Sequence, residues 1–231
     1  MAQYYQIQGL LCLVVILVLV CIGMPVNASD PDPVVDNPAN VKSFTLHNVF
    51  RNANITTGPG GVRAALSTTN FPGSIGQGIT VVRFELLPCG VNVPHTHPRA
   101  SELVSLISGG PMQVGFIDTA GEAHFDILYP GDATLFPRAL LHFEINLGTK
   151  TASFVSALNS ENPGTLIAGA SLFRTPKAVV ATALHSEAKV LEKIAKSIST
   201  NLLALQLADK EFCIPGKNAS LGVFQTGDLV P

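Results

Sequence analysis

Charged residues are scarce in this chain of 231 residues: Asp, Glu, Lys and Arg together make up 13% of it, and the formal net charge is −2. Such a chain has no basic surface of the kind that binds nucleic acid or an anionic membrane. The sequence also contains no phosphate-binding loop, dinucleotide-binding fingerprint or internal repeat. Its 47% of hydrophobic residues suffices for a sizeable core in one domain, with or without an appendage.

Long apolar runs are confined to the N-terminus, where residues 10–22 form a run of signal-peptide size. Val26 and Ala28 then supply the small residues that a signal peptidase requires at positions −3 and −1. We therefore expect residues 1–28 to be a cleaved signal peptide, and the mature protein to be secreted with no membrane segment. Residues 1–8 carry no Lys or Arg, so an uncleaved anchor of marginal length is the alternative.

Cysteine is also scarce, with four in the whole chain. Cys12 and Cys21 lie in the signal peptide, which leaves Cys89 and Cys213 in the mature protein. In an oxidising compartment, two remaining cysteines favour a disulfide, within or between chains, over free thiols. Secretion also makes the sequons at Asn54 and Asn218 expected glycosylation sites.

Short strand-like runs, divided by Gly, Pro and Asn, fill the sequence up to about residue 158. Their even spacing is typical of a β-sandwich or β-barrel. The expected strands cover residues 43–49, 62–68, 79–86, 102–107, 112–118, 124–128, 133–136, 140–147 and 151–158.

The pattern changes from strands to helices near residue 162. Thr175 and Pro176 read as an N-cap followed by proline at the first helical position. A second helix is expected to open at Ser186, and a third short helix to cover residues 202–208. The expected organisation after the signal peptide is an extended arm at 29–42, a β-domain at 43–160, and a helical extension and tail at 161–231.

Three potential metal ligands lie within eight residues: His95, His97 and Glu102. Pro94 and Pro98 bracket the two histidines and disfavour a helix. In an extended strand, alternate side chains point to the same face, so His95 and His97 are expected to project together. Two histidines followed by a carboxylate predict a site for a first-row transition metal, which needs at least one further ligand.

His142 is the candidate for that further ligand. Its strand has an apolar face made by Leu141, Phe143 and Ile145, and His142 points to the other face. A lone histidine on such a strand is more often structural than a ligand. A site that already holds two histidines and one carboxylate nevertheless favours another nitrogen donor. Surface or structural roles are expected for His47, His124 and His185.

The spacing of these residues resembles the two sequence boxes of the cupin superfamily. The first box is matched by Gly90, His95, His97, Glu102 and Gly109, and the second by Gly131, Pro137, His142 and Asn146. The flanking words HTHPRA (95–100), FPR (136–138) and SDPDP (29–33) resemble plant germin-like proteins specifically.

The resemblance implies an all-β fold, a cupin jelly-roll β-barrel with a short C-terminal helical extension. It also implies a homo-oligomer, typically a hexamer built as a trimer of dimers, and one manganese ion bound by His95, His97, Glu102 and His142. A mixed nitrogen and oxygen set without thiolate argues against a structural zinc site. Iron and zinc use the same ligand types and stay open as alternatives.

The cysteines depart from the germin-like pattern. The usual cysteine pair of the N-terminal arm is missing, and Cys89 occupies a position that is usually glycine. We expect Cys89 and Cys213 to form a substitute disulfide between the barrel rim and the C-terminal tail. The alternative is one buried and one exposed free cysteine.

Two further departures concern the pocket. Oxalate-oxidising germins hold substrate with two asparagines; Asn92 matches one of them, and Val82 replaces the other. A valine cannot hydrogen-bond a carboxylate, and the loss of one buried polar contact costs about 1–3 kcal/mol. Glu144 replaces a frequent glutamine, and by strand parity it shares a face with His142.

The function that this resemblance favours is a manganese-dependent superoxide dismutase, because a small inorganic substrate needs no elaborate pocket. Oxalate oxidase is less favoured, since Val82 removes one contact to the substrate. A third interpretation is a non-catalytic cell-wall glycoprotein of the plant apoplast, which acts through oligomerisation or ligand binding and whose metal is chiefly structural.

Overall fold

The computed structural model describes residues 44–205, 212–218 and 220–222. The expected signal peptide (1–28) and N-terminal arm (29–42) lie outside these residues. Within the described residues, no helix is long and apolar enough to cross a membrane.

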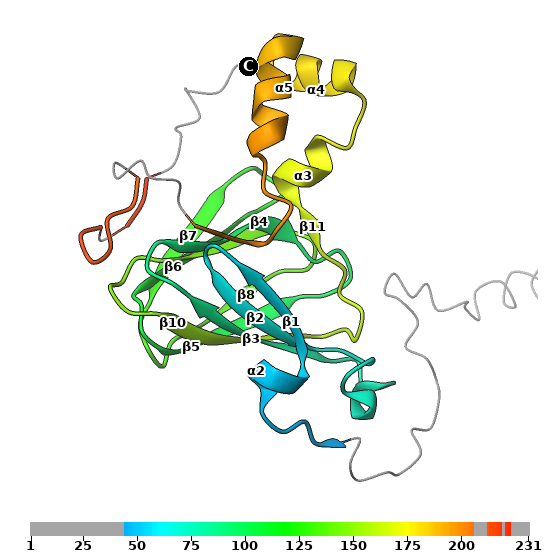
Figure 1. Cartoon of the computed structure of the whole chain (residues 1–231), viewed down its shortest axis with the longest axis vertical. Coiled ribbons are helices and arrows are strands. Elements are labelled where there is room, and N and C mark those ends of the chain that lie inside the picture. The colour runs from blue at the N-terminus through cyan, green and yellow to red at the C-terminus, as the bar shows by residue number, and fades with distance from the viewer. Residues whose placement is uncertain (1–43, 206–211, 219, 223–231) are drawn as a thin grey trace, which may run out of the picture. The chain divides into compact units, whose positions relative to one another are not determined.

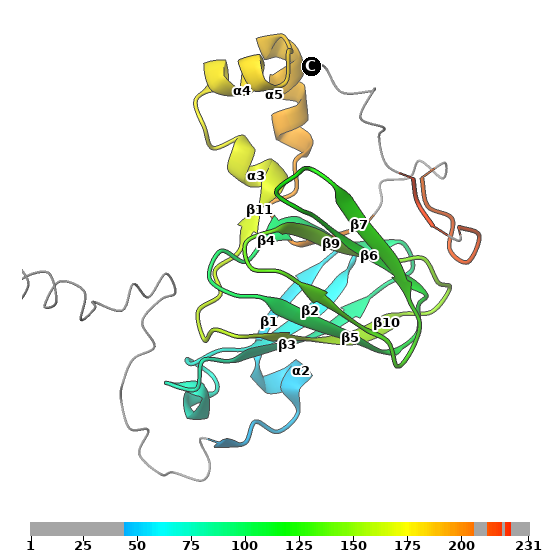
Figure 2. The same ribbon diagram turned by 180° about the vertical axis from the view of Figure 1, so that it is seen from behind.

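The described chain forms two antiparallel β-sheets (Figure 1), as the sequence predicted. The first sheet has the strand order β1-β2-β3-β10-β5-β8. Its strands are β1 (Asn54–Gly58), β2 (Gly61–Leu66), β3 (Thr80–Leu86), β5 (Glu102–Ser108), β8 (Ala133–Phe136) and β10 (Ala152–Leu158). The second sheet has the order β11-β4-β9-β6-β7 (Figure 2), and β12 also pairs with β4. Its strands are β4 (Gly90–Thr96), β6 (Met112–Ile117), β7 (Ala123–Leu128), β9 (Leu141–Asn146), β11 (Leu166–Ile167) and β12 (Leu203–Leu205).

The main core lies between the two sheets. Burial alternates residue by residue along β3 and β10, because successive side chains of a strand point to opposite faces. Phe84 and Phe154 lie directly opposite each other on these strands, and their rings stack at 4.6 Å. Met112 and Val114 of β6 complete the same core from the second sheet. The resulting fold is the cupin jelly roll that the sequence predicted.

Asn146 holds the turn that follows β9. Its side-chain amide donates to the carbonyls of Leu86 (2.9 Å) and Lys150 (2.8 Å), and its Oδ1 accepts a hydrogen bond from the N–H of Gly148 (2.9 Å). A Cβ atom at Gly148 would lie 1.8 Å from the carbonyl oxygen of Gly110, so only glycine fits there. The geometry of this turn therefore explains why asparagine suits position 146, the last residue of the second box.

Several short helical segments accompany the sheets in the described part of the chain. They are α2 (Val49–Asn52), the 3₁₀ helix η2 (Pro72–Ser74), α3 (Ala168–Leu172), α4 (Lys177–Ala183) and α5 (Ala188–Ser197). The predicted helices at 175 and 186 correspond to α4 and α5, whose N-caps are Pro176 and Glu187. Each of these two helices buries one apolar residue, Val180 and Leu191 respectively.

Two of the predicted elements are wrong. No strand covers the described residues 44–49, and Val49 instead begins α2. The predicted helix at 202–208 is replaced at Leu203–Leu205 by β12, which pairs with Gly90–Asn92 of β4; residues 206–208 lie outside the described chain. Here, the unpaired backbone groups of an existing strand edge outweigh local helical spacing.

Cys89 and Cys213 are joined by a disulfide with a Cα–Cα distance of 6.0 Å. Both cysteines are buried in a small cluster with Ile145 and Leu147. Cys89 has a φ of 58°, in the left-handed region that favours glycine. This conformation explains why glycine suits the position, and the disulfide attaches residue 213 to the rim of the barrel.

Candidate metal centre

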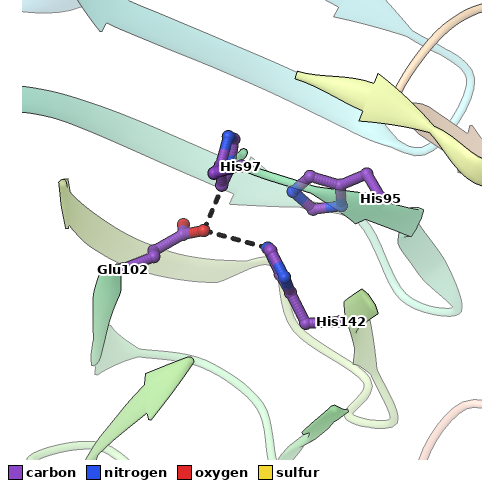
Figure 3. Close-up of side chains that lie close together, drawn as sticks. All are labelled: His95, His97, Glu102 and His142. Carbon is purple, nitrogen blue, oxygen red and sulfur yellow. Dashed lines mark hydrogen bonds and ion pairs between the residues drawn. The ribbon is translucent and has the colours of Figure 1, made fainter. Parts of the chain in front are cut away.

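Three strands bring the candidate ligands together inside the barrel. His95 lies on β4 directly opposite His142 on β9. His97 follows the end of β4, and Glu102 is the first residue of β5, in the other sheet. All four side chains are buried, with exposed fractions of 1% to 8%. The four residues therefore converge from both sheets on one point (Figure 3).

The ligand atoms of these residues lie within 4.8 Å of one another. Glu102 Oε2 is 3.1 Å from Nε2 of His97 and 3.1 Å from Nε2 of His142, as the dashed lines in Figure 3 mark. The His95 ring lies 4.3 Å from the His142 ring and 5.0 Å from the His97 ring, centroid to centroid. One small ion between these atoms could reach all four.

The opposite ring nitrogen of each histidine is held by a backbone carbonyl. The Nδ1 atoms of His95, His97 and His142 lie 2.8, 2.6 and 2.8 Å from the carbonyl oxygens of Val93, Gly164 and Leu140 respectively. Each Nδ1–H therefore donates to its carbonyl, which leaves Nε2 available to a metal ion. Such contacts fix the tautomer and orientation of metal-binding histidines.

The electrostatics of the site also suit a cation. Burial, with a further contribution from His142, lowers the pKa of His95 to about 3, so its imidazole is neutral at neutral pH. Burial alone would raise the pKa of Glu102, but the contacts with His142 and His97 hold it below its ordinary range, so Glu102 is a carboxylate. The Nε2 atoms of His97 and His142 both contact Glu102 Oε2 at 3.1 Å. A metal ion bound at this point would displace the protons of these contacts, because an imidazole coordinates through a deprotonated nitrogen.

The donor set is three imidazole nitrogens and one carboxylate oxygen, and both described cysteines are in the disulfide. This combination suits a redox-active or hydrolytic first-row metal rather than a thiolate-bound structural zinc. The residues present thus fit the ion that the sequence predicted, while their chemistry leaves the choice among manganese, iron and zinc open.

A cavity of about 210 Å³ adjoins the ligands. Its wall includes His95, His97 and Glu102 and, deeper in the first sheet, Val82 and Phe84. Other lining residues are Arg63, Ala65, Ser67, Thr80, Leu158, Glu161, Asn162, Pro163, Thr165 and Leu202. The cavity is small, and its wall at Val82 offers no hydrogen-bond donor.

Asn92 and Glu144 lie beside the metal centre but outside the lining of this cavity. They occupy opposite positions on β4 and β9, and both are fully buried. Within the described residues, their side-chain atoms make no hydrogen bond of ordinary geometry. Burial, followed by the negative charge of Glu102, raises the pKa of Glu144 well above its ordinary value, and the nearby Asn92 amide opposes this only in part. The prediction that Glu144 shares a face with His142 is confirmed, since both side chains are buried on β9. The predicted contact between Asn92 and a substrate stays a prediction.

The remaining predicted residues lie away from the centre. His124 is exposed and 2.9 Å from Asp118, which is consistent with a surface role. The sequon residue Asn54 is exposed on the edge strand β1, whereas Asn218 Oδ1 accepts a hydrogen bond from the N–H of Ile214 (2.7 Å). Glycosylation at either asparagine stays a prediction.

Sequence reasoning missed two kinds of participant. The carbonyls of Val93, Leu140 and Gly164 are backbone groups, so no residue type signals their role. Arg63 and Ala65 both line the cavity. They lie two positions apart in a predicted strand, so the alternation of side chains along a strand places them on the same face.

Comparison with known proteins agrees with this geometry. The family model described as Cupin matches residues 47–191. Spherulin-1A of Physarum polycephalum is 38% identical over 157 residues, and the match covers 66% of this chain and 63% of that protein. The chain thus spans less than two thirds of that relative. Germin-like protein 5-1 of Oryza sativa subsp. japonica is 33% identical over 208 residues, which cover 80% of this chain and 94% of the relative.

Among solved structures, a recombinant oxalate oxidase in complex with glycolate superposes with a TM-score of 0.62 at 27% identity. The superposition covers 73% of this chain and 98% of the oxalate oxidase.

Proposed function

Because this chain belongs to the cupin family and is related to its germin-like proteins, we propose that it is a secreted manganese protein with superoxide dismutase activity. The observation that carries the proposal is the buried centre of three histidines and one glutamate, which adjoins a cavity of about 210 Å³. A bound manganese ion would supply one-electron chemistry by changing between two oxidation states.

The chain's own residues would provide three conditions for this chemistry. The backbone carbonyls orient the imidazoles, so that little reorganisation is needed when the ion binds. Glu102 supplies one negative charge to offset that of the ion. The cavity of about 210 Å³ has room for a small substrate beside the candidate ligands.

Oxalate oxidation is the second candidate, and the similarity to oxalate oxidase favours it. Val82 counts against it, since this side chain lines the cavity where an amide would hold the substrate. The absence of one buried hydrogen bond costs about 1–3 kcal/mol, or roughly one to two orders of magnitude in affinity.

Secretion and assembly are part of the same proposal. The disulfide between Cys89 and Cys213 supports an oxidising compartment such as the apoplast or cell wall. Exposed apolar side chains on α4 and α5, among them Val179, Val190 and Ile194, fit a homo-oligomer, proposed to be a hexamer. A non-catalytic cell-wall oligomer would share these features, so activity must be measured.

The test is metal analysis of the purified secreted protein together with superoxide and oxalate assays. We expect about one manganese ion per chain, dismutase activity in the wild type, and loss of both in His95→Ala. His124→Ala is the matched control, because His124 is exposed and lies away from the centre. A wild-type protein that holds metal but leaves superoxide unchanged would overturn the dismutase proposal, and oxalate turnover would replace it with the second candidate.

A further inference from the structure

Arg63 is a basic residue in the wall of the cavity that adjoins the metal ligands. It lies on β2 opposite Phe84 of β3, whose side chain is in the core. Residues directly opposite each other in an antiparallel pair project from the same face of the sheet. The Arg63 side chain therefore shares the inner face of the first sheet with Phe84, and the cavity places it near His95 and Glu102.

The Arg63 guanidinium forms no ion pair and no hydrogen bond within the described part of the chain, although the carboxylates of Glu102 and Glu161 line the same cavity. Its buried Nε has no partner among the described residues. Burial lowers the pKa of Arg63, although a guanidinium stays protonated at neutral pH. A partly buried guanidinium whose Nε–H lacks an acceptor favours an anion that can accept its hydrogen bonds.

The other charged groups at the cavity are already engaged. Glu161 accepts a hydrogen bond from the N–H of Gly76 (2.6 Å). Arg99 does not line the cavity itself; it donates to the backbone carbonyl and the side-chain oxygen of Asn162, which does, both at 2.6 Å. Arg63 is thus the basic group in the lining whose donors remain available to a ligand.

We propose that Arg63 binds small oxyanions in this cavity and selects them as the substrate class of the adjoining metal centre. The inference rests on the proposed function for the role of the metal, but the anion site itself is defined by the protein. Arginine is suited to this role because its planar fork of N–H donors pairs with two acceptor atoms at once. A cavity of about 210 Å³ has room for a small anion such as superoxide or a short carboxylate.

The test uses formate as the probe, titrated by calorimetry into the purified full-length protein with its metal and after metal removal. We expect Arg63→Met to weaken formate binding at least tenfold in both forms, and Arg63→Lys, which keeps the charge, to weaken it less. Arg83→Met is the matched control. Arg83 of β3 lies opposite Ala64, the residue that follows Arg63 on β2. Its guanidinium packs over the Phe50 ring, 5.5 Å from the ring centroid. Formate binding in Arg83→Met should equal that of the wild type.

Arg63→Gln provides a second neutral variant if Arg63→Met fails to fold. Formate affinity that is unchanged in the folded neutral variant, or undetectable in the wild type, would overturn the inference. Formate binding that depends on Arg63 in a protein that takes up no metal would support the anion site while the proposed metal function fails. The two proposals can therefore fail separately.

Discussion

His95 and His142 lie directly opposite each other on β4 and β9, and their imidazole rings are 4.3 Å apart. Each ring is held at Nδ1 by the carbonyl of the residue two positions before it, Val93 and Leu140 respectively. Two strands thus build the same contact and present two Nε2 atoms to one point. The pair supplies two of the four candidate ligands, and Glu102 and His97 from neighbouring segments supply the other two.

Acid should destabilise the metal-free protein through His95. Its pKa is about 3 in the folded protein and 6.5 in the unfolded chain. Between these values the unfolded chain binds the additional proton, so the free energy of unfolding falls as pH decreases, by about 1.4 kcal/mol per pH unit for one group. Urea unfolding between pH 7 and pH 4 measures this slope.

His95→Asn provides the control for the acid effect, because asparagine does not titrate in this range. Its slope should be smaller than that of the wild type by roughly one proton, or about 1.4 kcal/mol per pH unit. Equal slopes would show that other groups cause the acid sensitivity. In the metal-loaded protein, acid should also release the ion, since a protonated imidazole cannot coordinate.

Replacing Glu102 with glutamine should weaken metal binding at least tenfold. The change keeps the size of the side chain but removes the carboxylate charge from a buried centre with three imidazoles. Equilibrium dialysis against a competing chelator measures the affinity. Glu122→Gln, at an exposed position of the β6–β7 turn, should bind metal like the wild type. If the two variants bound metal equally well, Glu102 would not be a ligand.

Glu144→Gln should raise the free energy of unfolding of the metal-free protein at pH 7. Burial and the charge of Glu102 raise the pKa of Glu144, so folding at neutral pH requires proton uptake or a buried charge. The stability of the wild type is therefore fully present below about pH 4.3, the ordinary pKa of glutamate, and decreases as pH rises above it.

Glutamine stays neutral at every pH, so the advantage of Glu144→Gln should vanish near pH 4. Denaturant unfolding at pH 4 and pH 7 tests this, with Glu122→Gln again as the exposed control. A variant that is less stable than the wild type at pH 7 would show that the ionised carboxylate contributes a favourable contact.

Removing the disulfide by Cys89→Ser and Cys213→Ser should lower the free energy of unfolding by about 2–4 kcal/mol. The bond closes a loop with a sequence separation of 124 residues, which restricts the unfolded chain strongly. Thermal unfolding with and without a reductant measures the loss. A wild type whose unfolding is insensitive to reduction would contradict the prediction.

The backbone of Cys89 allows a sharper version of this experiment. Combining Cys213→Ser with Cys89→Gly should give a protein more stable than the double serine variant by about 1 kcal/mol. Glycine adopts a φ of 58° without the penalty paid by a residue with a side chain. Equal stability of the two variants would show that the surrounding contacts already compensate for the backbone strain at position 89.

The sequence by itself determined the type of fold and identified the four candidate ligands. Alternating apolar residues bounded by turn residues specify strands because burial of one face requires a period of two. His95, His97, Glu102 and His142 could be predicted because their chemistry and spacing match a known pattern. The two mature cysteines indicated a disulfide for a similar reason, since the residue type itself carries the chemistry.

Tertiary structure alone decided how these residues meet. Asn92 and His95 are three positions apart, which would place their side chains on opposite faces of a regular strand. Both are nevertheless buried, because the register of β4 against β9 shifts between them. Pro94 lies in this interval and has no N–H to give to the strand pairing. Parity along the sequence therefore fails at the one place where the ligand strand is irregular.

The anchors of the histidines, the partnerless Arg63 and the strand at Leu203–Leu205 depend on tertiary structure in the same way. Backbone carbonyls from Val93, Leu140 and Gly164 look alike in any sequence and differ only in where the fold places them. The stretch after residue 202 pairs with β4 because an unpaired strand edge offers hydrogen bonds that a short helix would not gain. Residue chemistry thus selected the candidate metal ligands, and long-range backbone pairing determined their geometry.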